Sequence, residues 1–316
     1  METGSILLMA LLGAFALDRG FGEPAARWHP VVWMGRYLDW AGRRIAARER
    51  VPTADWPAFW RGALAWSVAA GALVLVAWQV EAFVLSLGGL LAAALLAVLL
   101  KPMLAWRMLR EEVMAVEGAL AESLDAGRAQ LGRLVSRDVL ELQEGEVRES
   151  AIESLAENLN DSVVAPVFWF LVAGLPGAVL YRFANTADAM WGYRGLRAGR
   201  QWEWAGKWAA RADDGLSWVP ARATALLLAL VAGGIPPRRL RAEAAQTPSP
   251  NSGWPMAAMA LALRVRLGKP GVYTLNARGE VPDAGHVERA GVLAGRAVGA
   301  LLLAAALVLY LKGPFP

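Results

Sequence analysis

The sequence predicts an all-α fold, a polytopic integral membrane helix bundle with about four to six membrane segments and amphipathic helices on its cytoplasmic face. Three observations lead to this prediction: an apolar composition, long apolar runs and the lack of a convincing strand pattern. The chain has 316 residues, 56% of them hydrophobic and 19% charged, whereas soluble domains carry about 25% charged residues. Its mean hydropathy is +0.36.

The longest apolar run covers residues 62–100, with Glu81 as its only charge. One membrane crossing takes about 20 residues, so this run predicts two crossings with a turn between Gln79 and Gly89. Residues 291–311 predict a further crossing, with Arg296 near its start.

Three other apolar segments are less regular. Residues 5–17 predict a short first span or a re-entrant helix, and a cleaved signal peptide is not expected because the basic region that would precede it is missing. Residues 219–234 are barely long enough for one membrane crossing. Residues 162–183 are long enough to cross but contain Gly174, Pro176 and Gly177. Irregular backbone at membrane depth persists only where protein or a wet cavity covers it, so this break suggests a water-accessible site within the bilayer.

The distribution of charge predicts the orientation. A hairpin over 62–100 returns the chain to the side it left, so residues 18–61 and 101–161 share a compartment. Residues 18–61 carry eight Arg, and 236–290 carry eight basic residues. The positive-inside bias places both in the cytoplasm, provided that 162–183 and 219–234 both cross or both turn back. We therefore expect a multi-pass protein of the cytoplasmic (inner) membrane with its polar motif loops mainly cytoplasmic.

The same composition excludes several functions. The net charge is +4, but residues 101–161 carry 13 carboxylates against 7 bases, so no basic stripe predicts nucleic acid as a partner. The chain has no cysteine and therefore no thiolate metal site. It also lacks a P-loop and a Rossmann fingerprint. The lipid bilayer is an expected partner, whereas the sequence leaves open whether the chain forms a homo-oligomer or associates with other enzymes.

We expect one integral membrane domain over 1–316, with a cytoplasmic helical hairpin over about 103–147 inserted within it. Apolar residues recur at helical spacing on both sides of Gly127, which offers a helix stop. Tryptophans flank the apolar runs, as indoles at the headgroup level do, with stacking on a ligand as the alternative. They are Trp56, Trp60, Trp202, Trp204, Trp208 and Trp218.

Four acids, Glu149, Glu153, Glu157 and Asp161, recur every four residues, a spacing that stacks side chains on one helix face. No Lys or Arg lies among them, and like-charge pairs at this spacing cost about 0.2–0.5 kcal/mol each. A divalent cation would reverse that penalty, and Asn158 adds a neutral oxygen. The alternative is a solvated acidic helix face. We predict metal ligands at Glu153, Glu157, Asn158 and Asp161.

Two further segments combine acids with arginines. RFANTADAMWGYR (182–194) follows the broken helix, and RADDGLSWVPAR (211–222) precedes the next apolar segment. Each is interpreted either as helix caps at the membrane interface or as a site for phosphate, metal or amine. The candidate residues are Arg182, Asn185, Asp188, Arg194, Arg211, Asp213, Asp214 and Arg222.

Two loop motifs complete the candidates. GEPAARWHPVVWMGR (22–36) contains His29, for which a structural role and a binding role are both open. TPSPNSGWPMAAMA (247–260) is a turn rich in Pro, where Asn251 is a plausible cap or ligand group.

Taken together, these motifs resemble the adenosylcobinamide-phosphate synthase family, membrane enzymes of cobalamin assembly. The resemblance extends from residue 17 to about 270, with the motifs in the family's order, and E-N-x-x-D-x-V-V-A-P and N-T-x-D-x-M-x-G-Y are its most specific parts. Three positions depart from the family pattern: Glu23 and Ser162 replace the usual Asp and Gly, and Met256 replaces an acid found in many members.

The resemblance implies a carbon–nitrogen ligase that uses ATP and Mg²⁺. Its substrates would be the corrinoid adenosylcobyric acid and (R)-1-amino-2-propanol O-phosphate or a related aminoalkyl phosphate. Our hypothesis for the division of roles gives proton transfer to Asp188 or Asp214, and Mg²⁺ binding to the acidic helix and Asp213. Substrate and phosphate binding fall to His29, Arg182, Asn185, Arg194, Arg211, Arg222 and Asn251.

Two other functions are weighed against this one. A transporter would explain the broken helix, but it predicts ionisable groups at mid-span, whereas these acids lie at span ends. A Mg²⁺-dependent membrane phosphotransferase would also use paired acids, but its D-G-x-x-A-R signature is not met, because five residues separate Gly215 from Ala221.

Overall fold

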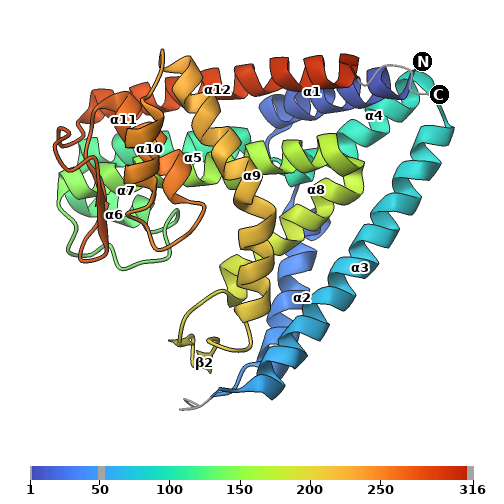
Figure 1. Cartoon of the computed structure of the whole chain (residues 1–316), viewed down its shortest axis with the longest axis horizontal. Helices are drawn as coiled ribbons and strands as arrows, with labels where there is room; N and C mark the ends of the chain where they lie inside the picture. Colours follow the sequence, from blue (N-terminus) through green and yellow to red (C-terminus); the bar gives the residue numbers. More distant parts are fainter. Residues whose placement is uncertain (1, 49–53, 312–316) are drawn as a thin grey trace. The chain divides into compact units, whose positions relative to one another are not determined.

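The computed structural model describes residues 2–48 and 54–311, and it is built almost entirely of helices (Figure 1). Within these residues, six helical segments are long and apolar enough to cross a membrane. They are Thr3–Phe21, Trp56–Ser86, Gly89–Glu122, Glu144–Trp191, Lys207–Val231 and Ala284–Leu311. The predicted all-α, polytopic membrane fold is therefore confirmed.

The chain divides into two compact units. Unit 1 comprises Met1–Leu104, Ala165–Ser217 and Leu307–Pro316, and unit 2 comprises Ala105–Val164 and Trp218–Ala306. Each unit has buried apolar residues of its own. The single membrane domain expected from the sequence stays a prediction.

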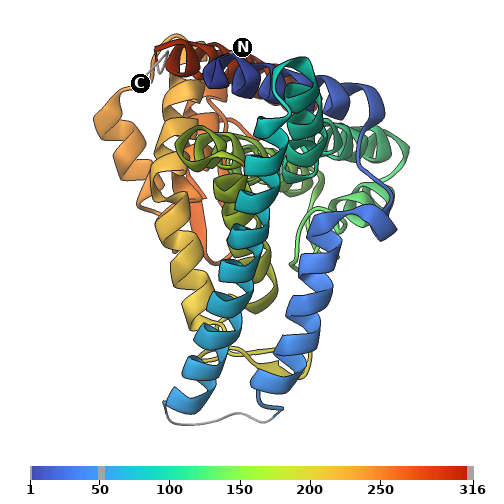
Figure 2. The ribbon, with the colours of Figure 1, turned by 90° about the vertical axis from the view of Figure 1, so that its right-hand side faces the viewer.

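Unit 1 is a helical bundle in which α2 (Pro30–Ile45) and α3 (Trp56–Ser86) both pack on α8 (Ala165–Trp191) (Figure 2). Helix α1 (Thr3–Phe21) packs on α4 (Gly89–Leu100). Its core gathers apolar residues from α2, α3, α8 and the start of α9 (Lys207–Val231), among them Met34, Leu38, Trp66, Phe183, Ala187, Trp191 and Ala209. Short 3₁₀ turns cover Ala26–Trp28 and Lys101–Met103.

The turn predicted within 62–100 lies between Gln79 and Gly89, as expected, with α3 ending at Ser86 and α4 beginning at Gly89. With 12 residues, α4 is shorter than one crossing, and the segment long enough to cross is Gly89–Glu122. Gly88 and Gly89 take φ of +69° and +60°, a region that glycine enters without steric cost. The short first segment is longer than its apolar core of 5–17, because α1 continues through Phe21.

Helix α8 is broken where the sequence predicts a break. Ala173 and Gly174 have non-helical backbone angles, and Gly174 takes φ +64°. The backbone N–H of Leu175, which begins the second half, donates to Glu81 Oε1 of α3 at 2.9 Å. A Cβ on Gly174 would collide with the same carboxylate. Glu81, the one charge in the run 62–100, therefore caps the second half of α8.

Four of the six tryptophans expected to act as anchors are exposed, Trp204 is half-buried and one is buried. Trp56, Trp60, Trp208 and Trp218 are exposed, whereas Trp202 is buried and stacks on Trp191 with ring centroids 6.2 Å apart. The prediction was wrong for Trp202, because the loop after α8 folds back and packs this indole into the core of unit 1.

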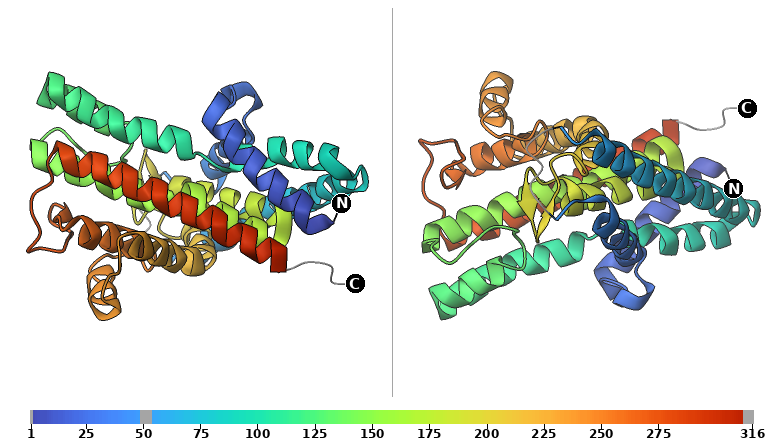
Figure 3. Two further views of the ribbon diagram at one scale, coloured as in Figure 1. Left: turned by 90° about the horizontal axis from the view of Figure 1, so that it is seen from above. Right: turned by 90° about the horizontal axis from the view of Figure 1, so that it is seen from below.

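Unit 2 is organised around α5 (Trp106–Glu122) and α7 (Glu144–Leu159), which pack together. A π-helical turn over Asn160–Val164 follows α7. Figure 3 shows residues 284–306 of α12 (Ala284–Leu311) running alongside α5 and α7. The remaining helices of unit 2 are α6 (Leu124–Leu131), the end of α9, α10 (Pro237–Ala244) and α11 (Gly253–Leu263).

The helical hairpin predicted over about 103–147 is divided at a different residue from the one expected. The chain breaks at Ser123, whose hydroxyl accepts from the N–H of Ala126 at 3.1 Å and caps α6. Gly127 lies inside α6, where a Cβ would collide with Leu120 of α5. Gly127 is therefore a packing residue rather than a helix stop.

Two small antiparallel hairpins were not predicted. In unit 1, β1 (Leu196–Arg197) pairs with β2 (Arg200–Gln201). In unit 2, β3 (Leu267–Lys269) pairs with β4 (Tyr273–Leu275). Strands of two or three residues are too short to show the alternation by which a strand is recognised in a sequence.

Candidate functional site

The predicted residues of α8 and α9 lie beside the contact between these two helices in unit 1. The helices are joined by a hydrogen bond between Tyr181 Oη and Ser217 Oγ of 3.1 Å, and by Trp169 Nε1, which donates to the carbonyl of Leu216 at 3.0 Å. Phe183, Ala184, Ala187 and Ala209 are buried in one core cluster, with Ala212 packed against it. The polar candidates alternate with these contact residues along both helices: Arg182, Asn185, Asp188, Asp213 and Asp214.

Charges of both signs occupy this α8–α9 polar cluster. Arg182 Nε and Asp213 Oδ1 are buried. Arg194, in the loop after α8, exerts its positive charge on Asp214. The carboxylate of Asp188 lies against Gly192, where a Cβ would collide with it. The fold thus brings Arg194 near Asp214, while Arg211 is exposed on α9.

His29 belongs to a separate polar network in unit 1. Its Nδ1 accepts from the N–H of Val31 at 3.2 Å and caps α2, and its Nε2 lies 2.9 Å from Glu23 Oε2. Lys101 Nζ lies 2.8 Å from Glu23 and 3.2 Å from Asp18. Both ring nitrogens of His29 are thus engaged within the chain, which favours the structural role. Its substrate-binding role stays a prediction.

The same network shifts the pKa of Glu23. Burial raises the pKa of this carboxyl, but hydrogen bonds from His29 and Lys101 and their positive charge outweigh burial and hold it below its ordinary value. Sequence reasoning missed Asp18 and Lys101 as partners. The sequence did offer one indication: Asp18 and Lys101 each directly follow an apolar run.

In unit 2, the fold supplies cations to the acidic face of α7. Arg266 Nη2 donates to Glu149 Oε1 at 2.9 Å, and Arg137 Nη2 lies 3.3 Å from Glu153 Oε2. Glu149 and Glu153 are both almost fully buried. The expectation of an unpaired acidic ribbon was therefore wrong for its first half, because the partners come from outside the helix.

The second half of the acidic face meets the π-helical turn. The π-helical turn begins at Asn160, so Asp161 lies within it and not in the regular α-helix that the sequence predicted. Asn160 Nδ2 donates to Asp161 Oδ1 at 2.8 Å, and Thr224 Oγ1 donates to Asn160 Oδ1 at 3.1 Å. Asn158 Nδ2 donates to the carbonyl of Ser154 at 2.9 Å. Such π-turns occur frequently at functional sites.

The acids of α7 also act on Tyr273 of β4. Burial raises the pKa of this phenol, and the negative charges of Glu153 and Glu157 raise it further. Among the described residues, no three His, Asp or Glu side chains gather as a metal-binding group. The ligand set predicted for a metal stays a prediction, since Mg²⁺ commonly takes one or two carboxylates and completes its shell with phosphates and water.

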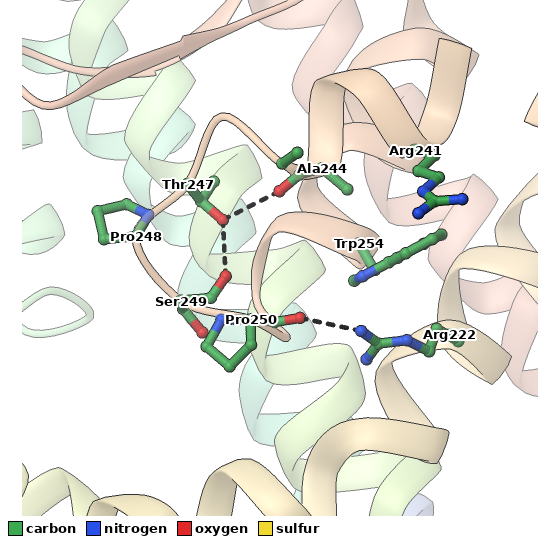
Figure 4. Close-up of a pocket in the computed structure, with 9 residues that line it drawn as sticks. Arg222, Arg241, Ala244, Thr247, Pro248, Ser249, Pro250 and Trp254 are labelled. Atoms are coloured by element: carbon green, nitrogen blue, oxygen red, sulfur yellow. Dashed lines mark hydrogen bonds between the residues drawn. The ribbon is translucent and has the colours of Figure 1, made fainter. Parts of the chain in front are cut away.

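Arg222 and Asn251, predicted separately as phosphate-binding residues, meet in unit 2 (Figure 4). Arg222 Nη1 donates to Asn251 Oδ1 at 3.0 Å and to the carbonyl of Trp218 at 2.7 Å. Its guanidinium lies 4.2 Å and 4.9 Å from the ring centroids of Trp218 and Trp254. These contacts tie the loop before α11 to α9 and fix the guanidinium.

A cavity of about 430 Å³ opens beside this guanidinium. Figure 4 shows Arg241 of α10 pointing toward Trp254 from the side opposite to Arg222. Neither Arg241 nor Trp254 was predicted from the sequence, although Trp254 lies within TPSPNSGWPMAAMA. Two guanidinium groups around one indole suit an anionic, phosphate-bearing ligand. This cavity is referred to below as the Arg222 pocket.

The sequence matches the family described as CobD/Cbib protein over residues 11–298. The chain belongs to the CobD/Cbib family. It is 42% identical over 311 residues to the cobalamin biosynthesis protein CobD of Stutzerimonas stutzeri, covering 94% of this chain and 96% of the relative. It is 38% identical over 283 residues to the probable cobalamin biosynthesis protein CobD of Methanothermobacter thermautotrophicus, covering 87% of each chain. No solved structure matches it.

In this CobD/Cbib protein, the predicted site residues fall into two groups. Unit 1 holds His29, Arg182, Asn185, Asp188, Arg194, Arg211, Asp213 and Asp214. Unit 2 holds Glu153, Glu157, Asn158, Asp161, Arg222 and Asn251. Met256, where many family members are expected to carry an acid, is buried in unit 2 and accepts a weak contact from Tyr273 Oη at 3.8 Å.

Proposed function

We propose that this protein is an enzyme of cobalamin biosynthesis that joins adenosylcobyric acid to (R)-1-amino-2-propanol O-phosphate, or to a related aminoalkyl phosphate, in an ATP-dependent reaction. The product is adenosylcobinamide phosphate. Membership of the CobD/Cbib family and the names of the relatives support the pathway. The observation that carries the phosphate chemistry is the Arg222 pocket, because its arginines can bind phosphate oxygens bidentately.

The proposed reaction has two steps. A carboxylate oxygen of adenosylcobyric acid attacks the γ-phosphorus of ATP, and the bond to the ADP oxygen breaks. The amine then attacks the carbonyl carbon of this acyl phosphate, forms the C–N bond and releases inorganic phosphate. The ammonium must lose its proton before it attacks, and we assign this proton transfer to Asp188 or Asp214; the positive charge of Arg194 near Asp214 supports phosphate binding there.

Mg²⁺ would supply charge neutralisation on the transferred phosphoryl group. Glu157, Asn158 and Asp161 offer the hard oxygen donors that this ion prefers. Glu153 fits less well than the sequence suggested, since it already pairs with Arg137. We also propose Asp213 of unit 1 as a candidate Mg²⁺ ligand, because its carboxylate is an oxygen donor of the kind that this ion prefers.

The protein is proposed to reside in the cytoplasmic membrane with its motif loops mainly in the cytoplasm. The six apolar helices support a membrane location. The orientation rests on the excess of basic residues in 18–61 and 236–290. ATP is available on that side.

The test is a ligation assay with the full chain in detergent or proteoliposomes. Adenosylcobyric acid, ATP, Mg²⁺ and aminopropanol phosphate are supplied, and mass spectrometry follows the amide product and ADP. We expect product only when all four are present, with Asp188→Asn or Asp214→Asn lowering turnover. The absence of an amide product with every aminoalkyl phosphate offered would overturn the proposed reaction.

A further inference from the structure

A second cavity, of about 380 Å³, lies in unit 1 at the loop between α8 and α9. Its lining includes Arg43 of α2, Tyr193, Arg197 and Arg200 of the loop, and the indole of Trp202. None of these residues belongs to the predicted site, and the proposed ligation does not use them. The cavity is referred to below as the hairpin pocket.

The hairpin pocket has an excess of positive charge. Asp39 is the only acid in its lining and pairs with Arg43 one helical turn away. Within residues 2–48 and 54–311, Arg197 and Arg200 form no ion pair with a carboxylate. Two of the three guanidinium groups are thus without a compensating charge from the described part of the chain.

The hairpin places these two arginines directly opposite each other. Arg197 of β1 is the cross-strand partner of Arg200 of β2, and like charges in such pairs destabilise a hairpin. The turn between them adds strain at Ala198, a non-glycine residue with φ +48°. A bound anion would convert the repulsion between the arginines into attraction.

Other contacts hold the guanidinium groups in place before any ligand binds. Arg200 Nη1 donates to the carbonyls of Arg43 at 2.8 Å and Ala46 at 3.0 Å. The Arg197 guanidinium lies 3.7 Å from the ring centroid of Tyr193. Because their positions are fixed, little side-chain entropy remains to be lost when an anion binds.

The setting of the pocket indicates the ligand class. Residues 192–206 connect two segments that are long and apolar enough to cross a membrane, so we expect this loop at a membrane surface. Exposed indoles occur on the adjoining helices at Trp40, Trp56 and Trp60, as expected at the headgroup level. The volume exceeds that of a bare phosphate and leaves room for an attached organic group.

We propose that the hairpin pocket binds a phosphate group, carried either by the headgroup of an anionic phospholipid or by a soluble phosphate ester. Arg43, Arg197 and Arg200 bind the phosphate oxygens, and Tyr193 and Trp202 contact the organic part. This site is separate from the proposed ligation and does not depend on it.

The experiment measures phosphate binding by the full chain with two probes. Native mass spectrometry measures which phospholipid the protein retains from nanodiscs of phosphatidylglycerol and phosphatidylcholine. Thermal unfolding in detergent measures how far inorganic phosphate stabilises the protein at constant ionic strength. Arg197→Gln removes a guanidinium that the fold does not use as a backbone donor. Arg27→Gln and Arg61→Gln, which change exposed arginines of the same unit, are the charge-matched controls.

We expect the wild type and both controls to bind at least one probe, and Arg197→Gln to weaken that binding about tenfold, the effect of losing one charge-assisted hydrogen bond. Selective retention of phosphatidylglycerol identifies the lipid as the source. Stabilisation by inorganic phosphate without lipid selectivity identifies a soluble ester. Equal binding by wild type and Arg197→Gln, or no binding of either probe by the wild type, would overturn the proposal. Arg197→Lys keeps the positive charge, so binding retained by this variant would show that Arg197→Gln weakens binding by losing the charge and not by unfolding.

Discussion

The carboxylate of Glu81 in α3 accepts the backbone N–H of Leu175 in α8 at 2.9 Å, at the point where α8 is broken. Glu81 is thus a helix cap supplied by a neighbouring helix. The N–H groups of a helix's first turn have no partner within their own helix, and in an apolar environment each must find one elsewhere.

Two substitutions of Glu81 should distinguish the contribution of its hydrogen bond to stability from that of its size. Glu81→Leu leaves the N–H of Leu175 without its acceptor and should lower stability by about 1–3 kcal/mol. Glu81→Gln keeps an acceptor of the same length and should lose less. Unfolding in detergent compares the two variants, and equal melting temperatures would show that the cap contributes nothing.

Gly174 should tolerate no side chain. Its φ of +64° and the Glu81 carboxylate beside its missing Cβ predict that Gly174→Ala lowers stability by about 1–3 kcal/mol. Gly71→Ala in α3 is the control, since its Cβ would meet nothing within 4 Å. A similar melting temperature for both variants would contradict the strained geometry.

Asp161→Asn tests the proposed metal site at the π-helical turn. We expect turnover to fall sharply while the protein still folds. At a hundred times its dissociation constant, Mg²⁺–ATP should stabilise the wild type by about 2.7 kcal/mol and the variant by much less. Asp125→Asn, at an exposed acid of α6, should behave as the wild type. Equal thermal shifts in Asp161→Asn and wild type would remove Asp161 from the site.

The lowered pKa of Glu23 predicts a loss of stability in acid. A carboxyl whose pKa is lower in the folded state stabilises the fold fully above its unfolded pKa, about 4.3. That contribution is lost as the pH falls through the lower folded value. Melting temperatures measured from pH 7 down to pH 3 should therefore fall less steeply for Glu23→Gln than for the wild type. Parallel curves would contradict the shift.

Single cysteines in this cysteine-free chain test the orientation. Arg44→Cys, Asp125→Cys and Arg238→Cys replace exposed residues of three polar segments. An impermeant maleimide should label all three only from the cytoplasmic side. Basic residues near Arg44 and Arg238 favour that compartment, and the hairpin over 62–100 returns Asp125 to the side of Arg44. Labelling of any one from the outside alone would refute the proposed orientation.

The sequence predicted features that depend on local composition. The break in α8 follows from Gly174 and Pro176, because both residue types act on their own backbone, and the turn before α4 follows from the length of the apolar run 62–100. Arg222 and Asn251 were both candidates, and they are hydrogen-bonded although 29 positions separate them in the sequence. Their meeting could not be read from spacing.

Partners distant in the sequence explain the errors. Glu149 appeared unpaired because its partner Arg266 lies 117 positions later. Trp202 appeared to be a membrane anchor because its flanking composition resembles that of the exposed tryptophans. Only the tertiary fold, which returns the loop onto Trp191, buries it.

The cap on α8 also constrains how the protein can be made. Glu81 and Leu175 are 94 positions apart, and ribosomes add about 5–20 residues per second. The α3 segment is therefore synthesised about 5–20 s before its partner exists. For that interval, the carboxylate of Glu81 must be solvated by water, shielded by the insertion machinery or neutralised by protonation. Membrane integration of α3 is predicted to become permanent only when α8 arrives, so chains truncated before Leu175 should be the ones that quality control removes.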